Sequence, residues 1–356
     1  MNIAEVNTPA LIKQFLKLPS GIYKNNKYWT LQLGSDIEHV FDPGKNSMFI
    51  NGNAKRWVVY NEWNMPAGRI AAFYNRAGDV CSGGFGFFEC AENYDCTATL
   101  LETAFTWLKQ QGCKTIEGSV NFGEKDRFWG ILTSGFDTPG LYLDNYNHPY
   151  YADYFQQFGL QEKDVIYTYK VAIDMIPAKR LDRIAKRLEE NEQVLFKPFC
   201  FAEIEKYAND MHKVYTHSFE EKNRLKHVSA EDIIQLIKTN KQALEENLIW
   251  MAYKNDQPVG LLAFIKDINQ SLAISHMRNN NEINLKGFAF SVIPEFRNRG
   301  IEFGLFSSLF KTLMINDNKY GLYFSGINAK TTQMHSFMEA LNATIFKVHK
   351  TFTLNF

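Results

Sequence analysis

The segment from Phe290 to Leu309 reads FSVIPEFRNRGIEFGLFSSL. An apolar run ends at Val292, a proline follows, and Arg297 to Gly300 precede a second apolar pattern. Backbone N–H groups at the start of a helix have no intrahelical partner, and the helix dipole adds partial positive charge there. The order strand, turn, helix therefore predicts a loop that can hold an anion such as a pyrophosphate, with Gly300 letting the backbone approach the ligand.

The segment VIPEFRNRGI (292–301) resembles motif A of the GNAT superfamily of acyl-CoA N-acyltransferases, whose usual form is V-x-P-x-x-[RQ]-x-x-G-x-[GA]. Further on, SGIN (325–328) and the helix and strand that follow resemble motif B of that superfamily. The resemblance implies that acetyl-CoA or another acyl-CoA serves as co-substrate and that no metal is needed. The residues that it implies for binding the coenzyme are Val292, Arg297, Asn298, Arg299, Gly300, Ile301 and Asn328. For Asn328 the alternatives are a contact to the substrate or a cap on the following helix.

The resemblance also implies where the chemistry takes place. In GNAT enzymes the thioester lies along the strand before motif A, which here is GFAFSV (287–292). A backbone N–H of Phe290, Ser291 or Val292 would then hold the thioester carbonyl oxygen as negative charge develops on it. An amine attacks the thioester directly, while a base removes its proton and another group protonates the thiolate.

Candidates for proton transfer and for substrate contacts lie in the second half of the chain, with Asp267 and His335 for the first role and Asn269 for the second. Asp267 and Asn269 follow a predicted hairpin, where a GNAT substrate pocket opens; the alternative is a plain turn with Asx hydrogen bonds. Many GNAT enzymes place a tyrosine general acid on the motif B helix, but Met338 stands at that position and cannot donate a proton. His335, one turn earlier, is the candidate that replaces it, against the alternative of a surface or packed histidine.

Two features depart from the pattern of the superfamily. Glu302 stands where motif A ends in a small residue. Its carboxylate would repel a pyrophosphate if it pointed into the loop, whereas as a cap on the helix it would stabilise the first turn by about 0.3–1 kcal/mol. The corresponding stretch of the first half, ECAENYD (89–95), is acidic and lacks glycine, so we expect no coenzyme A binding there. In the same half, Asp144 and Tyr146 are candidates for substrate contacts or for a structural corner.

The two halves of the chain follow similar orders of predicted elements. In each, three strands precede a helix, a strand, a second helix and a closing strand; the second half starts with a hairpin around Asn255 and Asp256. The repeated order predicts a duplicated α/β unit, each copy a mixed sheet with helices on its faces. The resemblance implies that the copies are two tandem GNAT-like domains, each with a mixed and mostly antiparallel sheet flanked by helices. We place the domains at 1–175 and 194–356, with a basic amphipathic connecting helix over 176–193. The resemblance to tandem GNAT-like bacterial proteins covers nearly the whole chain.

Composition narrows the classes of partner and compartment. The 356 residues contain 39 Lys and Arg against 39 Asp and Glu, which removes the electrostatic argument for binding nucleic acid. The five cysteines are an odd number without metal-type spacing, so we expect reduced, buried thiols. We see no export signal and no apolar run near the roughly 18 residues that span a bilayer. The expectation is a cytoplasmic protein that does not enter membranes, with a homo-oligomer left open.

Three functions remain open at this point. The first is transfer of an acyl group from acyl-CoA to a small-molecule or peptide amine. The second is a catalytically inactive GNAT-like protein that binds a ligand or partner, favoured by Glu302 and Met338. The third is an aminoacyl-tRNA-dependent transferase, which would need a basic face that the neutral net charge does not favour.

Overall fold

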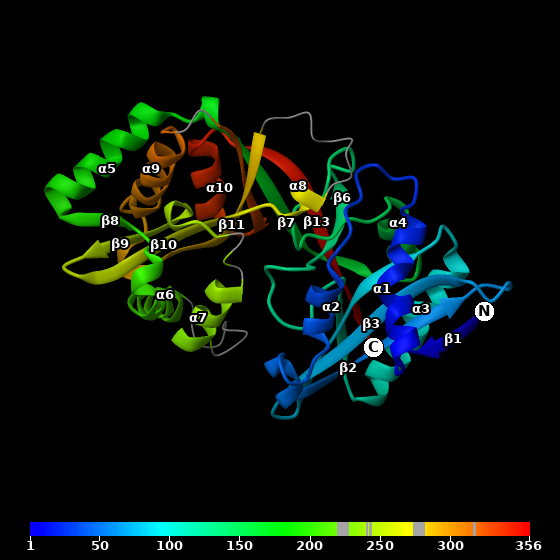
Figure 1. Cartoon of the computed structure of the whole chain (residues 1–356). Coiled ribbons are helices and arrows are strands. Elements are labelled where there is room, and N and C mark those ends of the chain that lie inside the picture. The colour runs from blue at the N-terminus through cyan, green and yellow to red at the C-terminus, as the bar shows by residue number, and fades with distance from the viewer. Residues whose placement is uncertain (219–227, 240, 242–243, 273–281, 316–317) are drawn as a thin grey trace. The chain divides into compact units, whose positions relative to one another are not determined.

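The computed structural model describes residues 1–356 apart from 219–227, 240, 242–243, 273–281 and 316–317 (Figure 1). The described chain forms two compact units. The first comprises Met1–Thr168, Gly326–Thr331 and Ile345–Phe356, and the second comprises Tyr169–Ser325 and Thr332–Thr344. Each unit contains strands of both orientations together with helices, which confirms the predicted α/β fold class.

The first unit is built on a mixed sheet. Its strands lie in the order β1 (Asn2–Glu5), β2 (Gly52–Tyr60), β3 (Pro66–Ala77), β4 (Val80–Cys90), β5 (Thr115–Gly118) and β13 (Thr344–Asn355), and β6 (Ile131–Ser134) also pairs with β13. The pairs from β1 to β4 are antiparallel, whereas β4 and β5 are parallel. Its helices are α1 (Pro9–Ile22), α2 (Gly34–Val40), the 3-10 helix η1 (Ser47–Ile50), α3 (Tyr94–Gln110) and α4 (Tyr150–Gln157).

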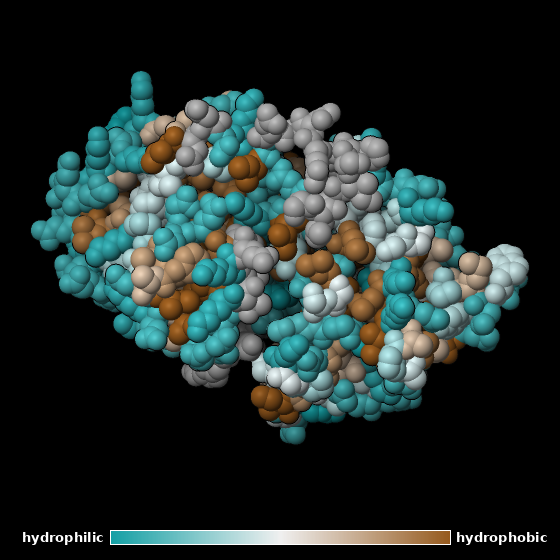
Figure 2. Space-filling view, in the orientation of Figure 1, coloured by the Kyte–Doolittle hydropathy of each residue, from teal (hydrophilic) through white to brown (hydrophobic). Residues whose placement is uncertain are grey.

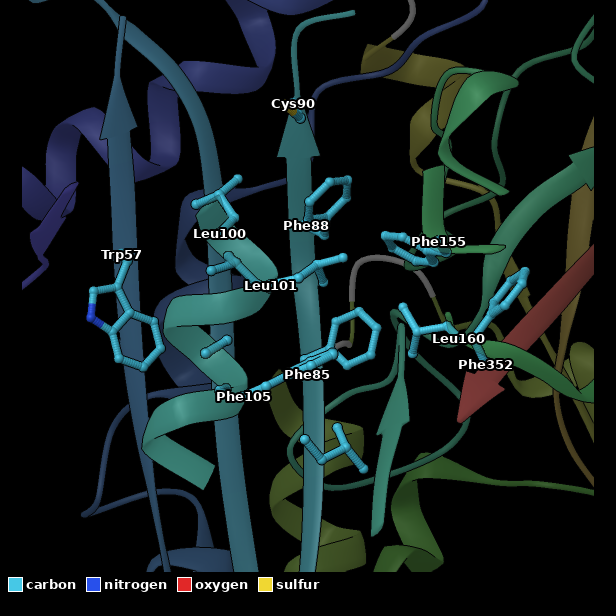
Figure 3. Close-up of a cluster of buried hydrophobic side chains, with 14 of the residues drawn as sticks. Trp57, Phe85, Phe88, Cys90, Leu100, Leu101, Phe105, Phe155, Leu160 and Phe352 are labelled. Carbon is cyan, nitrogen blue, oxygen red and sulfur yellow. The ribbon is translucent and has the colours of Figure 1, made fainter. Parts of the chain in front are cut away.

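Helix α3 shows why the apolar pattern of the first half folds as it does. Leu100, Leu101, Ala104, Phe105 and Leu108 recur at helical spacing and are at most 3% exposed. They pack with side chains of the sheet in one hydrophobic cluster, part of which is drawn in Figure 3. The sequence pattern predicts this inward face correctly, because burial of one stripe is what stabilises a helix on a sheet.

The second unit also contains strands of mixed orientation. Its strands lie in the order β12 (Lys319–Asn328), β11 (Glu282–Val292), β10 (Gln257–Lys266), β9 (Ile249–Lys254) and β8 (Val194–Pro198). Only the β11–β12 pair among these is parallel. Asn255 and Asp256 both adopt positive φ in the β9–β10 turn, which confirms the predicted hairpin.

The helices of the second unit surround this sheet. They are η2 (Ile173–Met175), α5 (Ala178–Glu192), η3 (Phe201–Glu203), α6 (Ile204–Ser218), α7 (Ala230–Thr239), η5 (Glu246–Leu248), α8 (Asn269–Leu272), η7 (Pro294–Phe296), α9 (Ile301–Leu313) and α10 (Thr332–Ala340). Helix α5, expected as a connector, packs against α9 through its buried face. Its basic side chains Lys179, Arg180 and Arg183 are exposed.

The two compact units do not follow the expected ranges 1–175 and 194–356 at their closing strands. Strand β7 (Gln161–Ala172) runs from the first unit into the second. Strand β13 pairs with the first unit, with Phe352 opposite Gly118 and His349 opposite Leu132. The last strand of the chain therefore completes the sheet of the first unit, although it follows the second unit in sequence.

The cysteines correct one expectation. Cys81, at the start of β4, and Cys113, after α3, form a disulfide with an S–S distance of 2.10 Å and a Cα–Cα distance of 4.7 Å. Cys90 and Cys96 are buried free thiols, and Cys200 is free and half-buried. An odd count and a separation of 32 residues give no pairing signal, since the bond depends on how β4 and α3 meet in space.

Among the described residues, no helix is both long enough and apolar enough to cross a bilayer. On the face drawn in Figure 2, hydrophobic residues are interspersed with hydrophilic ones.

Candidate active site

The motif A segment forms the turn between β11 and α9. After Val292 the chain makes the short helix η7, and then Asn298 and Gly300 take the left-handed φ values of 61° and 92°. A Cβ on Gly300 would lie 3.1 Å from Ile184 Cγ2 of α5. Glycine is therefore required here twice, by the backbone conformation and by the close approach of α5.

The first turn of α9 leaves backbone donors open. The carbonyl of Gly300 accepts hydrogen bonds from the amides of Phe303 and Gly304, at 3.0 and 3.1 Å. Within the described part of the chain, the amides of Arg299, Gly300 and Ile301 donate no hydrogen bond, and no side chain caps the helix. These amides are the groups that an anion can satisfy.

Two arginines, Arg297 and Arg187, shape this turn. Arg297 donates from Nε to the Val292 carbonyl (3.0 Å) and from Nη2 to the Ser218 carbonyl (2.7 Å). Arg187 of α5 donates from Nη2 to the Arg299 carbonyl at 2.8 Å. Arg297 thus fastens the turn to β11 and α6, and Arg187 fastens it to α5. The side chain of Arg299 is exposed, with its guanidinium 5.2 Å from the centre of the Phe296 ring.

Glu302 occupies part of the same helix end. Its half-buried carboxyl accepts a hydrogen bond from its own backbone N–H. Burial raises the pKa of the Glu302 carboxyl above its ordinary value, and the hydrogen bond from the amide opposes that rise. The side chain therefore uses one donor of the first turn and competes for it with an incoming anion.

Strand β11 separates from β12 just before the turn. The parallel pairing runs from Glu282 opposite Lys319 to Lys286 opposite Tyr323, and β11 then continues to Val292 without further pairing to β12 among the described residues. On its other edge β11 bulges, because Ala263 faces Ala289 while Phe264 faces Gly287. Ser291 and Val292 lie on the separated stretch, where backbone groups on the β12 side lack a ladder partner.

Aromatic side chains line this separated stretch within the second unit. The ring of Phe290 lies 5.1 Å from that of Phe337 and 6.2 Å from that of Phe324. Phe303, in the first turn of α9, lies 5.0 Å from Phe337. Phe324 and Phe337 are buried, whereas Phe290 and Phe303 are half-buried, so the backbone of β11 borders a largely apolar region at this point.

The motif B helix brings together a pair that sequence reasoning missed. His335 Nδ1 lies 2.8 Å from the hydroxyl of Tyr169, a residue of β7. Met338 is fully buried and belongs to the core, so it takes no part in proton transfer. Tyr169 supplies the phenol that the motif B pattern lacks, but it lies 166 residues from His335 in the sequence and carries no local signal.

Asp267 and Asn269 adopt the turn alternative. Both are buried, and Asp267 Oδ1 accepts a hydrogen bond from the Asn269 amide at 3.2 Å. The Asp267 amide donates to the Asn284 carbonyl near the start of β11. With about 3.3 Å of rise per strand residue, Asn284 lies roughly 20 Å along β11 from Ser291, so the structure does not bring Asp267 to Ser291.

The remaining candidates belong to the first unit. Asn328 Oδ1 accepts from the Lys330 amide at 2.9 Å, which closes the turn before α10. Tyr146 is buried, and its hydroxyl donates to the Phe136 carbonyl at 2.8 Å. The Asp144 amide donates to the Leu141 carbonyl at 3.0 Å. Asp144 and Tyr146 therefore form part of a hydrogen-bonded corner.

Comparisons of the sequence do not assign the chain to a family. The sequence matches no known family profile. It is 20% identical over 279 residues to the bacterial ceramide synthase of Caulobacter vibrioides. The match covers 77% of this chain and 72% of that protein.

Solved structures show the fold. A tandem GNAT protein from the clavulanic acid biosynthesis pathway is similar over 99% of this chain and 98% of its own, with a TM-score of 0.58 and 11% identity. The GCN5-related glucosamine N-acetyltransferase region of a fungal GH3 β-N-acetylglucosaminidase gives a TM-score of 0.61 at 11% identity; the match covers 99% of this chain but 38% of that longer one. The chain therefore has the fold of the GNAT N-acetyltransferases.

Proposed function

We propose that the protein is an N-acyltransferase that moves an acyl group from an acyl-CoA to an amine. One observation carries the proposal: the β11–α9 turn presents uncapped amides beside Gly300, directly after a strand that has separated from its parallel neighbour. The first feature suits the pyrophosphate, and the second suits a thioester lying along the strand. The GNAT fold supports the same reading.

The residues of this chain would divide the work as follows. Acyl-CoA supplies the activated thioester. The amides of Arg299, Gly300 and Ile301 would bind its pyrophosphate, and a backbone N–H between Phe290 and Val292 would donate to the carbonyl oxygen. As the amine nitrogen bonds to the carbonyl carbon and the C–S bond breaks, the amine loses a proton and the thiolate gains one. The Tyr169–His335 pair is the group that we propose for these proton transfers.

For the acceptor we propose an amine attached to an apolar chain. The similarity to a bacterial ceramide synthase supports a lipid amine, and the aromatic lining beside Phe290 suits an apolar ligand. A small-molecule or peptide amine is the broader alternative. Transfer to a long-chain amine, measured against a short-chain amine of the same headgroup, distinguishes these acceptors.

Glu302 favours a second candidate function, a GNAT-like protein that binds a ligand or partner without catalysis. Its carboxyl takes a donor that coenzyme A would use. Under this alternative, acyl-CoAs would not bind at millimolar concentration, and no acyl transfer would be detected with any amine.

The test is a thermal shift with acetyl-CoA and a long-chain acyl-CoA. We expect both to raise the melting temperature of the wild type and Gly300→Glu to abolish the rise, because the new side chain fills the turn. Gly159→Glu is the matched control: Gly159 also has a left-handed φ, 102°, but a Cβ at this position would have no described atom within 4 Å. A variant Gly300→Glu that still responds to acyl-CoA would refute the assignment of this turn.

A further inference from the structure

Helix α5 contributes a side chain to the turn that precedes α9. Arg187 of α5 donates from Nη2 to the Arg299 carbonyl at 2.8 Å. A Cβ on Gly300 would lie 3.1 Å from Ile184 Cγ2 and 3.7 Å from Arg187 Nη2, so α5 packs directly on this turn. Figure 1 shows the two helices side by side within the second unit. The helix that the sequence suggested as a connector is therefore part of the wall of the candidate site.

The contact with Arg187 determines where the Gly300 amide points. A trans peptide group is planar, so its C=O and N–H bonds point in opposite directions. The Arg299 carbonyl and the Gly300 N–H belong to one peptide group, and the carbonyl oxygen is directed at Arg187. The Gly300 N–H therefore points to the side of the turn opposite this guanidinium, and it donates no hydrogen bond within the described part of the chain.

Glycine alone does not hold this peptide group in place. Rotating the group by about 180° changes ψ of Arg299 and φ of Gly300, and glycine populates positive and negative φ about equally. After such a rotation the carbonyl oxygen would stand where the amide had been. The turn would then present a lone pair to an anion in place of a donor.

The other contacts of the turn do not involve this peptide group. Arg297 donates to carbonyls of β11 and α6. The Asn298 side chain accepts a hydrogen bond from Gln333 Nε2 of α10 at 3.3 Å. Among the described residues, the hydrogen bond from Arg187 is the one that the Arg299 carbonyl accepts. The orientation of the group therefore depends on Arg187.

On the basis of the proposed binding of acyl-CoA at this turn, we propose that Arg187 is a positioning residue, which fixes the Arg299–Gly300 peptide group with the Gly300 N–H towards the pyrophosphate. Its own helix competes little for the guanidinium, since Glu192 Oε1 lies 3.8 Å away, too far for a hydrogen bond. A charged donor holds a carbonyl more firmly than a neutral one. Without Arg187 the group would adopt both orientations, and acyl-CoA would bind only the fraction that presents the amide.

The peptide group can be observed by itself in the full chain. The sequence contains a single Arg–Gly dipeptide, Arg299–Gly300. Labelling arginine carbonyls with ¹³C and glycine amides with ¹⁵N therefore gives one carbonyl–amide correlation in an NMR spectrum. In the wild type, acetyl-CoA should shift the Gly300 amide proton downfield, as expected for a new hydrogen bond to an anion.

Arg187→Met removes the hydrogen bond. Because the Arg187 side chain is 53% exposed, the variant should fold like the wild type. We expect the carbonyl resonance of Arg299 to move before any ligand is added. The dissociation constant for acetyl-CoA, taken from the titration, should rise about tenfold. A variant that binds acetyl-CoA as the wild type does would overturn the proposal.

Two further variants separate orientation from charge. Arg183→Met is the matched control: Arg183 is exposed one turn earlier on α5, and its side chain has no hydrogen bond or ion pair among the described residues. It removes the same charge and should leave the Arg299–Gly300 correlation in place and the affinity within about twofold. Arg187→Lys keeps the charge without the planar fork and should restore only part of the affinity.

The outcomes distinguish this proposal from the proposed function. If Arg187→Lys restores full affinity while the Arg299 carbonyl resonance stays displaced, or if Arg183→Met weakens binding as much as Arg187→Met, charge alone attracts the ligand and the positioning role is wrong. If the wild type itself binds neither acetyl-CoA nor a long-chain acyl-CoA, the proposed function fails, and the positioning role fails with it.

Discussion

The β4–α3 and β11–α9 junctions are similar in backbone course and differ in the residues at which the helix begins. In each, a strand with an irregular register leaves its parallel neighbour and turns into a helix. After β4 the helix is closed by Asn93, whose side chain accepts a hydrogen bond from the Cys96 amide at 2.9 Å. After β11 the helix begins at Gly300, with no capping side chain and with open amides. The fold thus provides two equivalent positions, and the turn residues decide which of them can receive an anion.

The two junctions also differ in the burial and the partners of their acidic side chains. In the first unit the acid at the strand end, Glu89, is buried against Arg69 and two tyrosine hydroxyls. In the second unit the acid of the turn, Glu302, is half-buried and bonds to its own amide. A buried, paired acid is a structural element, whereas a half-buried acid at an open helix end can be displaced. Substitution of Glu89 should therefore mainly lower the stability of the fold, whereas substitution of Glu302 should mainly change acyl-CoA affinity.

The largest effect is expected for Glu89→Ala. Removing the carboxylate leaves Arg69 as an uncompensated buried charge and takes an acceptor from Tyr23 and Tyr151. The free energy of unfolding should fall by about 3–5 kcal/mol, measured by urea denaturation. Glu92→Ala, at an exposed acid of the loop that follows β4, should change it by less than about 0.5 kcal/mol. A loss below about 1 kcal/mol for Glu89→Ala would mean that the pair is not part of the folded framework.

The next-largest effect is a pH dependence of the free energy of unfolding, and it comes from a buried lysine of the first unit. Lys347 of β13 is fully buried and donates to the carbonyls of Gly135 and Thr138. Burial lowers the pKa of Lys347 to about 8, and Asp144 and Asp137 partly oppose this. Between this value and the ordinary pKa, about 10.4, the unfolded chain binds more protons, so stability should rise with pH by up to about 3 kcal/mol.

This rise must be measured below the range in which the tyrosines titrate. Burial raises the pKa of Tyr23 and Tyr151, so their contribution to stability is lost only as pH rises above about 10. The contact with Cys90 and burial likewise raise the pKa of the Cys96 thiol, which opposes the rise above about pH 8.5. Urea denaturation from about pH 7 to pH 9.5 should therefore show the free energy of unfolding of the wild type rising relative to that of Lys347→Met. Lys350→Met, which removes an ion pair with Glu162, should keep the wild-type slope. If Lys347→Met keeps the wild-type dependence of stability on pH, a group other than Lys347 causes that dependence.

Local patterns predicted much of this architecture. The inward face of α3, the hairpin at Asn255 and the turn at Gly300 each depend on residues within one or two turns of each other, and the structure contains all three. The placement of β13 in the first unit and the Cys81–Cys113 bond depend on distant segments meeting. Neither leaves a periodic signal in the sequence.

The candidate site divides in the same way. The sequence locates the turn from Arg297 to Ile301, because a motif of adjacent residues defines it. It does not reveal Tyr169 beside His335 or Arg187 beside Arg299, since these partners lie more than a hundred residues apart. Asp267 looked suitable by position along the chain, but its side chain closes a local turn far along β11 from Ser291. Which residue of β11 lies beside Asp267 depends on the register of the neighbouring strands, and the polar residues of the sequence do not reveal that register.

The smallest effect is expected for Glu302→Ala, and it bears most directly on the difference between the junctions. Removing the carboxyl frees the Glu302 amide and takes a negative charge away from the open helix end. Acyl-CoA binding, measured by calorimetry, should tighten by up to about fivefold, which corresponds to about 1 kcal/mol or less. Without ligand, the free energy of unfolding should fall by less than about 1 kcal/mol, because one helix-end interaction is lost. Asn93→Ala removes the cap of the other junction and should destabilise by a similar amount without altering acyl-CoA affinity. If Glu302→Ala weakens acyl-CoA binding instead, the carboxyl supports the turn in its binding conformation, and the open amides alone do not explain how the second junction differs from the first.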